Sequence, residues 1–126
     1  MYASEPPTAG GSLTFSSEIL VVRPAPGMTV SLSVTGAVET LTKALAVELA
    51  PARLRVNTVR FRRIDTPLLR SLPSLDSDDA IAAAGSTALL GRFGTAQEAA
   101  ASALFLMANN YVTGQFITVD GGETLS

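Results

Sequence analysis

Three observations predict that this chain folds into an α/β domain with a parallel β-sheet. Its 126 residues are 47% hydrophobic and only 16% charged, which suits one domain with a modest core. Three segments favour β-strands, and longer segments with helical signals separate them. Strands that alternate with helices of this length imply right-handed crossovers, and such crossovers join parallel strands.

The first strand is predicted at SLTFSS, residues 12–17, where β-favouring Leu13, Thr14 and Phe15 stand together. Residues 1–11 are rich in proline and glycine and are predicted to be a flexible lead-in, so the domain would span residues 12–126. The segment EILVVRPAPG follows the strand. Its apolar start could lengthen the strand, but its prolines predict a loop.

A long helix is predicted from MTVSLSVTGAVETLTKALAVELAP, residues 28–51. Pro51 ends it, because the residue before a proline is disfavoured in the α region. The apolar residues of this helix fall on one stripe and are expected to face the core. That stripe consists of Val34, Ala37, Val38, Leu41, Leu45 and Leu49. The other faces mostly hold the polar residues Glu39, Thr42, Lys43 and Glu48.

The second half of the chain contains two further strand signals, LRVNTVRF at 54–61 and QFITVDGG at 115–122. Residues 62–86 are mixed, with a short helix expected at 78–84 and ended by Gly85. Thr95 and Glu98 form a capping box that opens a second long helix. This helix is expected to end at Asn109 and Asn110, and its core contacts are predicted to be Ala103, Leu106 and Met107.

Composition excludes several kinds of chemistry. The chain has no cysteine and no histidine, so disulfides, thiol catalysis, a histidine triad and zinc sites built on these residues are impossible, and no metal site is predicted. A net charge of -2 gives no broad basic surface for nucleic acid. No signal-peptide pattern and no apolar run of about 20 residues is apparent, so we expect a soluble, cytoplasmic protein without membrane contact.

Several stretches, taken in order, resemble the C-terminal half of the short-chain dehydrogenase/reductase family. They are GSLTFSS, TGAVETLTKALAVELAP followed by RVNTV, then IDTPLL, GRFG and YVTGQFITVDGG, and they cover residues 11–123. The resemblance implies the C-terminal part of a Rossmann-type doubly wound fold, with about three parallel strands and flanking helices. It also implies hydride transfer between NAD or NADP and an alcohol or carbonyl compound.

The cofactor half of the family pattern is not matched. In the family, the N-terminal half carries the glycine-rich turn that holds the pyrophosphate and the residue that selects NAD or NADP. Gly10 and Gly11 precede a strand instead of following one, so they do not match that turn. The resemblance therefore predicts poor cofactor binding by this chain, and neither the cofactor choice nor the small-molecule substrate can be read.

Three positions match the catalytic residues of the family. Ser17 matches a strand-end serine that hydrogen-bonds the substrate; alternatively, it satisfies backbone groups. Ser31 and Thr35 stand where the family keeps a tyrosine, the general acid/base, and a lysine. An aliphatic hydroxyl is a much weaker acid than a phenol, and threonine carries no charge. Some members with a similar RPAPG loop and GAVE helix also lack this pair.

Ser31 is more simply interpreted as the N-cap of the long helix. Lys43, which is the only lysine, lies eight residues beyond Thr35, about 12 Å along a helix, and cannot replace the missing charge.

The family contacts the nicotinamide through a turn that follows the second strand, and Ile64 and Thr66 match that turn. Phe61 and Arg62 replace the proline and glycine of the family. We interpret Arg60, Arg62 and Arg63 as a solvated basic cluster; the alternative is a contact from Arg62 or Arg63 to an NADP phosphate. An apolar pocket or a lid is predicted from Leu68, Leu69, Leu72 and Leu75, and Asp120 is predicted to be structural.

Three hypotheses remain open on the sequence. The chain is an oxidoreductase of this family with weak or no activity of its own, a non-catalytic association module, or a truncated gene product. The resemblance implies homo-oligomer contacts through the helix at 34–50 and through the last strand. The first strand would also leave an open sheet edge, which is a site for partners or aggregation.

Overall fold

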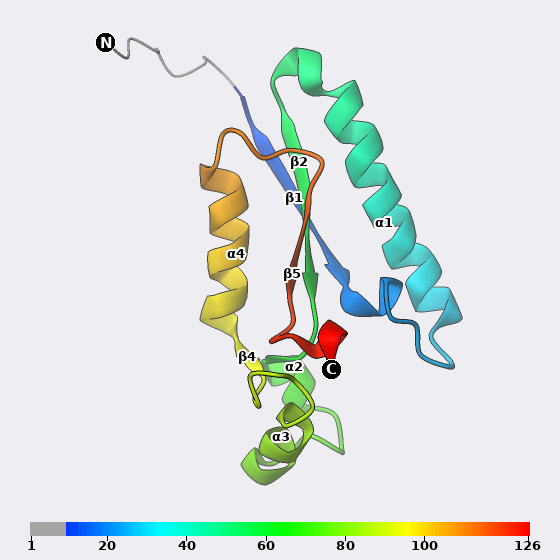
Figure 1. The fold of residues 1–126 in the computed structure, drawn as a ribbon, viewed down its shortest axis with the longest axis vertical. Coiled ribbons are helices and arrows are strands. Elements are labelled where there is room, and N and C mark those ends of the chain that lie inside the picture. The colour runs from blue at the N-terminus through cyan, green and yellow to red at the C-terminus, as the bar shows by residue number, and fades with distance from the viewer. Residues whose placement is uncertain (1–9) are drawn as a thin grey trace.

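The structure is a computed structural model that describes residues 10–126, so the predicted lead-in at 1–11 lies almost wholly outside the described residues. Figure 1 shows three layers, with α1 on one face of a central sheet and α4 on the other. The sheet is parallel and has the strand order β1-β2-β5. The predicted α/β fold is therefore confirmed. The three strands are β1 (Ser12–Glu18), β2 (Arg55–Phe61) and β5 (Phe116–Val119).

Strand β5 is shorter than the sequence predicts, because a turn begins directly after Val119. Gly121 and Gly122 both adopt positive φ angles, of 62° and 82°. The left-handed region is open to glycine at little steric cost. At Gly122 a side chain is disfavoured for two reasons. The φ angle is positive, and a Cβ atom would lie only 2.8 Å from the side chain of Leu89.

Helix α1 (Thr29–Glu48) has the expected extent, but the prediction of its buried face is wrong. The residues buried against the sheet are Glu39, Thr42 and Ala46. Val34 and Leu41, which belong to the predicted core stripe, are 62% and 45% exposed. The helix is therefore turned so that much of its apolar stripe faces solvent.

Polar and small side chains explain this orientation of α1. The hydroxyls of Thr42 and of Thr58 in β2 lie 2.6 Å apart, and both side chains are fully buried. The Thr42 hydroxyl also donates to the carbonyl of Val38 within the helix. Buried polar groups are tolerated when they are hydrogen-bonded, and Ala46 adds a small buried side chain to the same face of the helix. Hydrophobicity alone did not reveal these partners.

Within residues 10–126, α1 is the one helix long and apolar enough to cross a membrane by length and composition alone. No such segment was expected from the sequence. The middle of α1 is tied to β2 by the threonine pair and, as described below, by Glu39. These contacts are those of a helix packed on a sheet.

Helix α4 (Ala96–Ala108) begins at the predicted capping box, with Thr95 as N-cap and Glu98 accepting from the Thr95 backbone. Leu106 is fully buried as predicted, but Met107 is 50% exposed, so its assignment to the core is wrong. Asn109 is the C-cap, as expected. Arg55 of β2 donates to the carbonyls of Leu106 and Met107, which satisfies two acceptors at the helix end.

The connection between β2 and α4 is more ordered than predicted. A second, two-stranded parallel sheet joins β3 (Ile64–Asp65) to β4 (Gly94–Thr95). The predicted short helix is present as α3 (Asp78–Gly85), and an unpredicted α2 (Pro67–Arg70) precedes it. Arg70 holds these pieces together, because its guanidinium pairs with Asp65 at 2.6 Å and with Asp78 at 2.8 Å.

Candidate functional site

The carboxyl ends of β1, β2 and β5 meet at one edge of the sheet, because all three strands run in the same direction. In open parallel α/β sheets, ligands bind outside these ends. A 3₁₀ turn at Ile19–Val21 and the C-terminal turn Glu123–Leu125 lie close together at this edge (Figure 1). The connection from β2 to β3 starts there as well.

Ser17 lies near the end of β1 and is 6% exposed. Its hydroxyl donates to a carboxylate oxygen of Glu39 at 2.8 Å, so its partner is a side chain of α1. The same carboxylate accepts two bonds from Arg60 of β2, each of 2.6 Å. Ser17, Glu39 and Arg60 thus form one network between the sheet and α1.

This network fixes the charge of Glu39. The bidentate hydrogen bonds from Arg60 hold the pKa of the Glu39 carboxyl below its ordinary value, with a smaller contribution from the Ser17 hydroxyl, although burial acts in the opposite direction. The pKa of Arg60 is raised by the same carboxylate. Arg60 also lies over the ring of Phe116, with 4.7 Å to the ring centroid. The Ser17 hydroxyl therefore faces an ionised acceptor.

Ser31 and Thr35 lie on the first turns of α1, and both hydroxyls are engaged. The Ser31 hydroxyl donates to the Glu18 carboxylate at 2.9 Å. The Thr35 hydroxyl donates to the carbonyl of Ser31 at 3.0 Å. The interpretation of Ser31 as the N-cap is wrong, because α1 begins at Thr29 and its N-cap is Met28. Ser31 instead ties the helix to the end of β1.

Ile64 and Thr66 lie beside an apolar cavity of about 670 Å³, between the β2–β3 connection, α2 and the start of α4. Ile64 belongs to β3, and Thr66 is the N-cap of α2, where its hydroxyl accepts from the backbone of Leu69. Leu75 is not among the lining residues, so the predicted set of four leucines is only partly right. The cavity is lined by Phe61, Arg62, Ile64, Thr66, Leu68, Leu69, Leu72, Ala96 and Ala99.

The interpretation of Arg60, Arg62 and Arg63 as a solvated cluster is wrong. Arg60 pairs with Glu39, and Arg62 pairs with Glu123 at 2.8 Å. Arg63 lies 3.9 Å from the same Glu123 carboxylate and donates to the carbonyl of Ala84 at 2.9 Å. Their side chains are mostly buried, because acidic partners distant in sequence compensate each charge.

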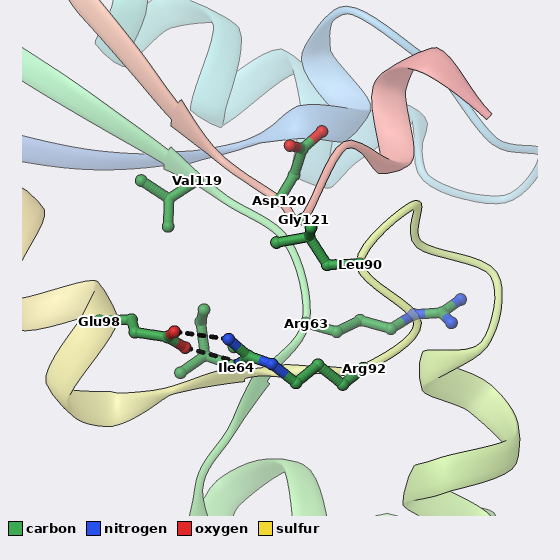
Figure 2. Close-up of a pocket in the computed structure, with 9 residues that line it drawn as sticks. Arg63, Ile64, Leu90, Arg92, Glu98, Val119, Asp120 and Gly121 are labelled. Carbon is green, nitrogen blue, oxygen red and sulfur yellow. Dashed lines mark hydrogen bonds and ion pairs between the residues drawn. The ribbon is translucent and has the colours of Figure 1, made fainter.

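Figure 2 shows a second, smaller cavity of about 160 Å³ beside β3 and the start of α4. Arg92 and Glu98 both line it and form a two-bonded ion pair with each other, with distances of 2.7 and 2.9 Å. The guanidinium of Arg92 and the backbone of Thr95 lower the pKa of Glu98 to about 2. Because Glu98 also completes the capping box of α4, we assign this pair a structural role.

Asp120 lines this second cavity, but its carboxylate points away from the Arg92–Glu98 pair (Figure 2). It accepts from the backbone of Gly122 and from both the backbone and the hydroxyl of Thr124, at 2.8 to 2.9 Å. These bonds lower the pKa of Asp120 in spite of its burial and hold the turn after β5. Among residues 10–126, no group of acidic side chains is arranged to hold a metal ion.

Three residues that make contacts near the strand ends were not predicted as functional from the sequence. Glu39 was placed on an outer face of the helix, and Glu123 and Arg23 were not considered. Arg23 donates to the backbone carbonyl of Glu123. A charged residue inside an otherwise apolar stretch, such as Glu39 in GAVETL, is a usable sign of a buried pair. No local pattern reveals partners that lie 61 or 100 residues apart.

Comparison with known proteins identifies the family. The family model described as enoyl-(acyl carrier protein) reductase matches residues 2–124. A short-chain dehydrogenase/reductase, ATR9, from Stachybotrys chlorohalonatus is 38% identical over 90% of this chain and 44% of its own length. A 3-oxoacyl-[acyl-carrier-protein] reductase, FabG, from Thermotoga maritima is 38% identical over 89% of this chain and 45% of its own length.

Solved structures agree with this result. A small-chain dehydrogenase in complex with NADPH superposes with a TM-score of 0.82 at 34% identity, covering 92% of this chain and 52% of that protein. The ligand-free aldohexose dehydrogenase of Thermoplasma acidophilum superposes with a TM-score of 0.81 at 30% identity, covering 91% of this chain and 48% of that protein. The chain belongs to the short-chain dehydrogenase/reductase family and has a partial Rossmann-type fold. It spans about half the length of the relatives that it matches.

The residues present match the family's cofactor site only in part. Ile64 of β3 and Thr66 border the apolar cavity of about 670 Å³. Thr35, at the position of the family's lysine, carries no charge and uses its hydroxyl inside the helix. The printed sequence contains no strand followed by a glycine-rich turn and a helix. The chain by itself therefore does not fit a complete NAD or NADP molecule.

Proposed function

We propose that this chain is the C-terminal part of an NAD(P)-dependent oxidoreductase fold acting on alcohols or carbonyl compounds, and that it has little or no turnover alone. The observation that carries the proposal is the state of the two hydroxyls on α1. Ser31 donates to Glu18, and Thr35 donates to its own helix. Neither group supplies an acidic proton or a positive charge for hydride transfer.

Two other parts of the proposed site would shape and orient a ligand: the apolar cavity and the Ser17 hydroxyl. The apolar cavity beside Ile64 and Thr66 would accept the uncharged nicotinamide ring of a reduced cofactor or an apolar substrate. A nicotinamide cofactor, when bound, would supply or accept the hydride. The Ser17 hydroxyl is held by ionised Glu39, which keeps it in one orientation near the end of β1. Within this proposal, Ser17 is a positioning element of the strand end.

Cofactor binding tests this proposal directly. The purified chain is titrated with NADH and NADPH up to millimolar concentration while cofactor fluorescence is followed. We expect no saturable change for the natural chain. A matched variant, Ser31→Tyr with Thr35→Lys, restores the two family residues on α1. Turnover by the natural chain, or saturable binding that the variant does not strengthen, would contradict the assignment of Ser31 and Thr35 as inactive.

A second candidate function is association with a second copy of the chain. It is favoured by the apolar residues that α1 turns to solvent; the stripe continues with Val30, which is 80% exposed. The other edge of β1 also has no strand partner within residues 10–126. Exposed apolar stripes and open strand edges are typical of interaction surfaces. We therefore propose a homo-oligomer formed through α1, with β5 as a second candidate contact.

Two further expectations stay predictions. A cytoplasmic location is tested by cell fractionation. A truncated gene product is tested by sequencing the transcript upstream of Met1. A continuous reading frame that encodes a strand, a glycine-rich turn and a helix would mark the chain as one part of a longer oxidoreductase.

A further inference from the structure

Three arginines converge on one glutamate at the carboxyl ends of the strands. Arg62 donates to the Glu123 carboxylate at 2.8 Å, and Arg63 lies 3.9 Å from the same oxygen. Arg23, from the loop after β1, donates to the backbone carbonyl of Glu123. The cations thus come from two separate segments, and the acceptor comes from a third, the turn after β5.

The charges in this cluster do not balance. Within residues 10–126, Arg23 forms no ion pair, while Arg62 and Arg63 share the single carboxylate of Glu123. Three guanidinium groups therefore lie around one side-chain carboxylate, and Ser126, the last residue of the 126-residue chain, borders the same place. The Glu123 side chain is largely covered, with 13% of it exposed, whereas Arg23 is exposed to solvent. A surplus of positive charge that includes an accessible guanidinium is an attractive site for an anion.

A cavity of about 260 Å³ lies beside this cluster. Arg23 and Arg62 supply charged donors on its wall, and Glu123 and Ser126 border it. The hydroxyl of Thr87 is also on the wall, but it donates to the carbonyl of Ala84. Ile19 and Leu20 form an apolar part of the wall. The combination of convergent cationic donors and a small apolar surface suits a compact organic anion better than a metal ion or an uncharged polar molecule.

We propose that this cavity binds a small carboxylate or phosphate anion and that Glu123 is an internal occupant that competes for it. The guanidinium group recognises carboxylate and phosphate oxygens alike, and the Glu123 carboxylate already accepts a single hydrogen bond from Arg62, so its side chain occupies the place of such a ligand. When the C-terminal turn moves aside, Arg62 loses its acidic partner, and Arg23 loses its only protein acceptor in the described residues. Arg63 then keeps its bonds to Ala84 and Thr87.

The inference goes beyond the proposed oxidoreductase function and does not depend on it. Binding of an anion to the arginines requires no nicotinamide, no hydride transfer and no second copy of the chain. It is measured in the absence of cofactor, so a negative cofactor titration leaves it standing. The reverse also holds, because anion binding without any cofactor binding would not support the oxidoreductase proposal.

Calorimetric titration of the full 126-residue chain with inorganic phosphate and, separately, with citrate tests the proposal at constant ionic strength. Glu123→Gln removes the competing charge, and we expect the affinity for the binding anion to rise by about 5-fold or more, the lower end of typical coupling between competing sites. Arg23→Gln and Arg62→Gln are expected to weaken binding by at least a similar factor. Arg23→Gln touches only a backbone carbonyl and should leave the fold intact.

Glu98→Gln is the matched control. It removes one negative charge from another arginine pair, and glutamine still serves the capping box, so α4 is preserved. We expect no change in anion affinity. Saturable binding of phosphate alone, or of citrate alone, supports the site and identifies its ligand class. The proposal is overturned if Glu123→Gln binds neither anion, if Glu98→Gln tightens binding equally, or if Arg23→Gln binds as the natural chain does.

Discussion

At the scale of single residues, the main feature of this chain is a buried carboxylate on a helix face that was expected to point away from the core. Glu39 is 8% exposed and lies between Ser17 and Arg60. A buried charge is tolerated only when it is paired and its oxygens are hydrogen-bonded. Both conditions hold here, because one oxygen accepts from Ser17 and Arg60 and the other accepts from Arg60. Glu39 thus joins α1 to two strands.

Replacement of Glu39 by glutamine should therefore destabilise the chain. The change keeps the size of the side chain but leaves the guanidinium of Arg60 without its counter-charge in a mostly buried place. Loss of one partner of a buried pair costs about 3 kcal/mol at the lower end of the usual range. Urea unfolding measures the loss. Glu48→Gln, on an exposed position of the same helix, is the control and should change stability by less than about 0.5 kcal/mol. Equal effects of the two variants would show that the pair has no special role.

The same pair predicts a dependence on pH. Arg60 lowers the pKa of Glu39 in the folded chain from an ordinary value of 4.5. A lowered folded-state pKa gives stability that is present above the unfolded pKa and is lost as the pH falls through the folded pKa. The stability difference between the natural chain and Glu39→Gln should therefore be full at pH 7 and should shrink below about pH 4.5. Urea midpoints at pH 7 and pH 3 measure it, and a difference of the same size at both values would rule out this linkage.

At the scale of elements, the sequence located helices and strands well but did not orient them. The strand segments, the extent of α1 and the capping box of α4 follow from local residue patterns, and the structure confirms them. The buried face of α1 depends on partners in β2 that are sixteen or more residues away. Hydrophobic periodicity contains no information about such partners. It therefore placed Val34 and Leu41 in the core and left Glu39 and Thr42 outside.

The candidate site shows the same division. The family pattern located the candidate site residues Ser17, Ser31, Thr35, Ile64 and Thr66 in the chain. Four leucines were predicted to line an apolar pocket, and three of them line the observed cavity. The hydrogen-bond partners of these residues were out of reach of the sequence. The clearest case is the basic segment RFRR, which reads as solvated but is paired with two distant glutamates.

The threonine pair between α1 and β2 should be worth a measurable amount of stability. Thr42→Val keeps the shape of the side chain but leaves the buried Thr58 hydroxyl without its side-chain partner, which should cost about 1 to 2 kcal/mol. Thr40→Val is the matched control, since Thr40 is exposed and makes only a local bond to the carbonyl of Gly36.

The double variant Thr42→Val with Thr58→Val separates two explanations of that cost. When both partners become apolar, no buried hydroxyl is left unpaired, and the loss should be largely recovered. Chemical unfolding of the two single variants, Thr42→Val and Thr58→Val, and of the double variant measures these differences in stability. An additive loss in the double variant would mean that packing, and not the hydrogen bond, holds this part of α1 on the sheet.

At the scale of the whole molecule, several surfaces are left uncovered within residues 10–126. They include the free edges of β1 and β5, which are the outer strands of the sheet, and the solvent face of α1. The exposed apolar residues on that face recur at helical spacing, so they form one continuous stripe. This solvent stripe consists of Val30, Val34, Ala37, Leu41 and Ala44. A soluble chain seldom exposes such a stripe along a whole helix unless another surface covers it.

If a second copy covers the solvent stripe, charges placed in it should separate the copies. Light scattering coupled to size exclusion is expected to show a concentration-dependent dimer or larger oligomer for the natural chain. Val34→Glu with Leu41→Glu should shift it to a monomer, because both side chains would have to be desolvated at the contact. The fold should survive, since both positions already face solvent in the single chain.

The control for this experiment is Val22→Glu, which adds a charge at an exposed apolar residue outside α1. It should leave the oligomer intact, because it lies off the solvent stripe. A natural chain that stays monomeric at every concentration would remove α1 as a homo-oligomer contact. An oligomer that survives the double substitution would instead direct attention to β5 and to the free edge of β1. A contact through either strand edge would pair backbone groups of two copies, so a charge added on α1 should affect it less.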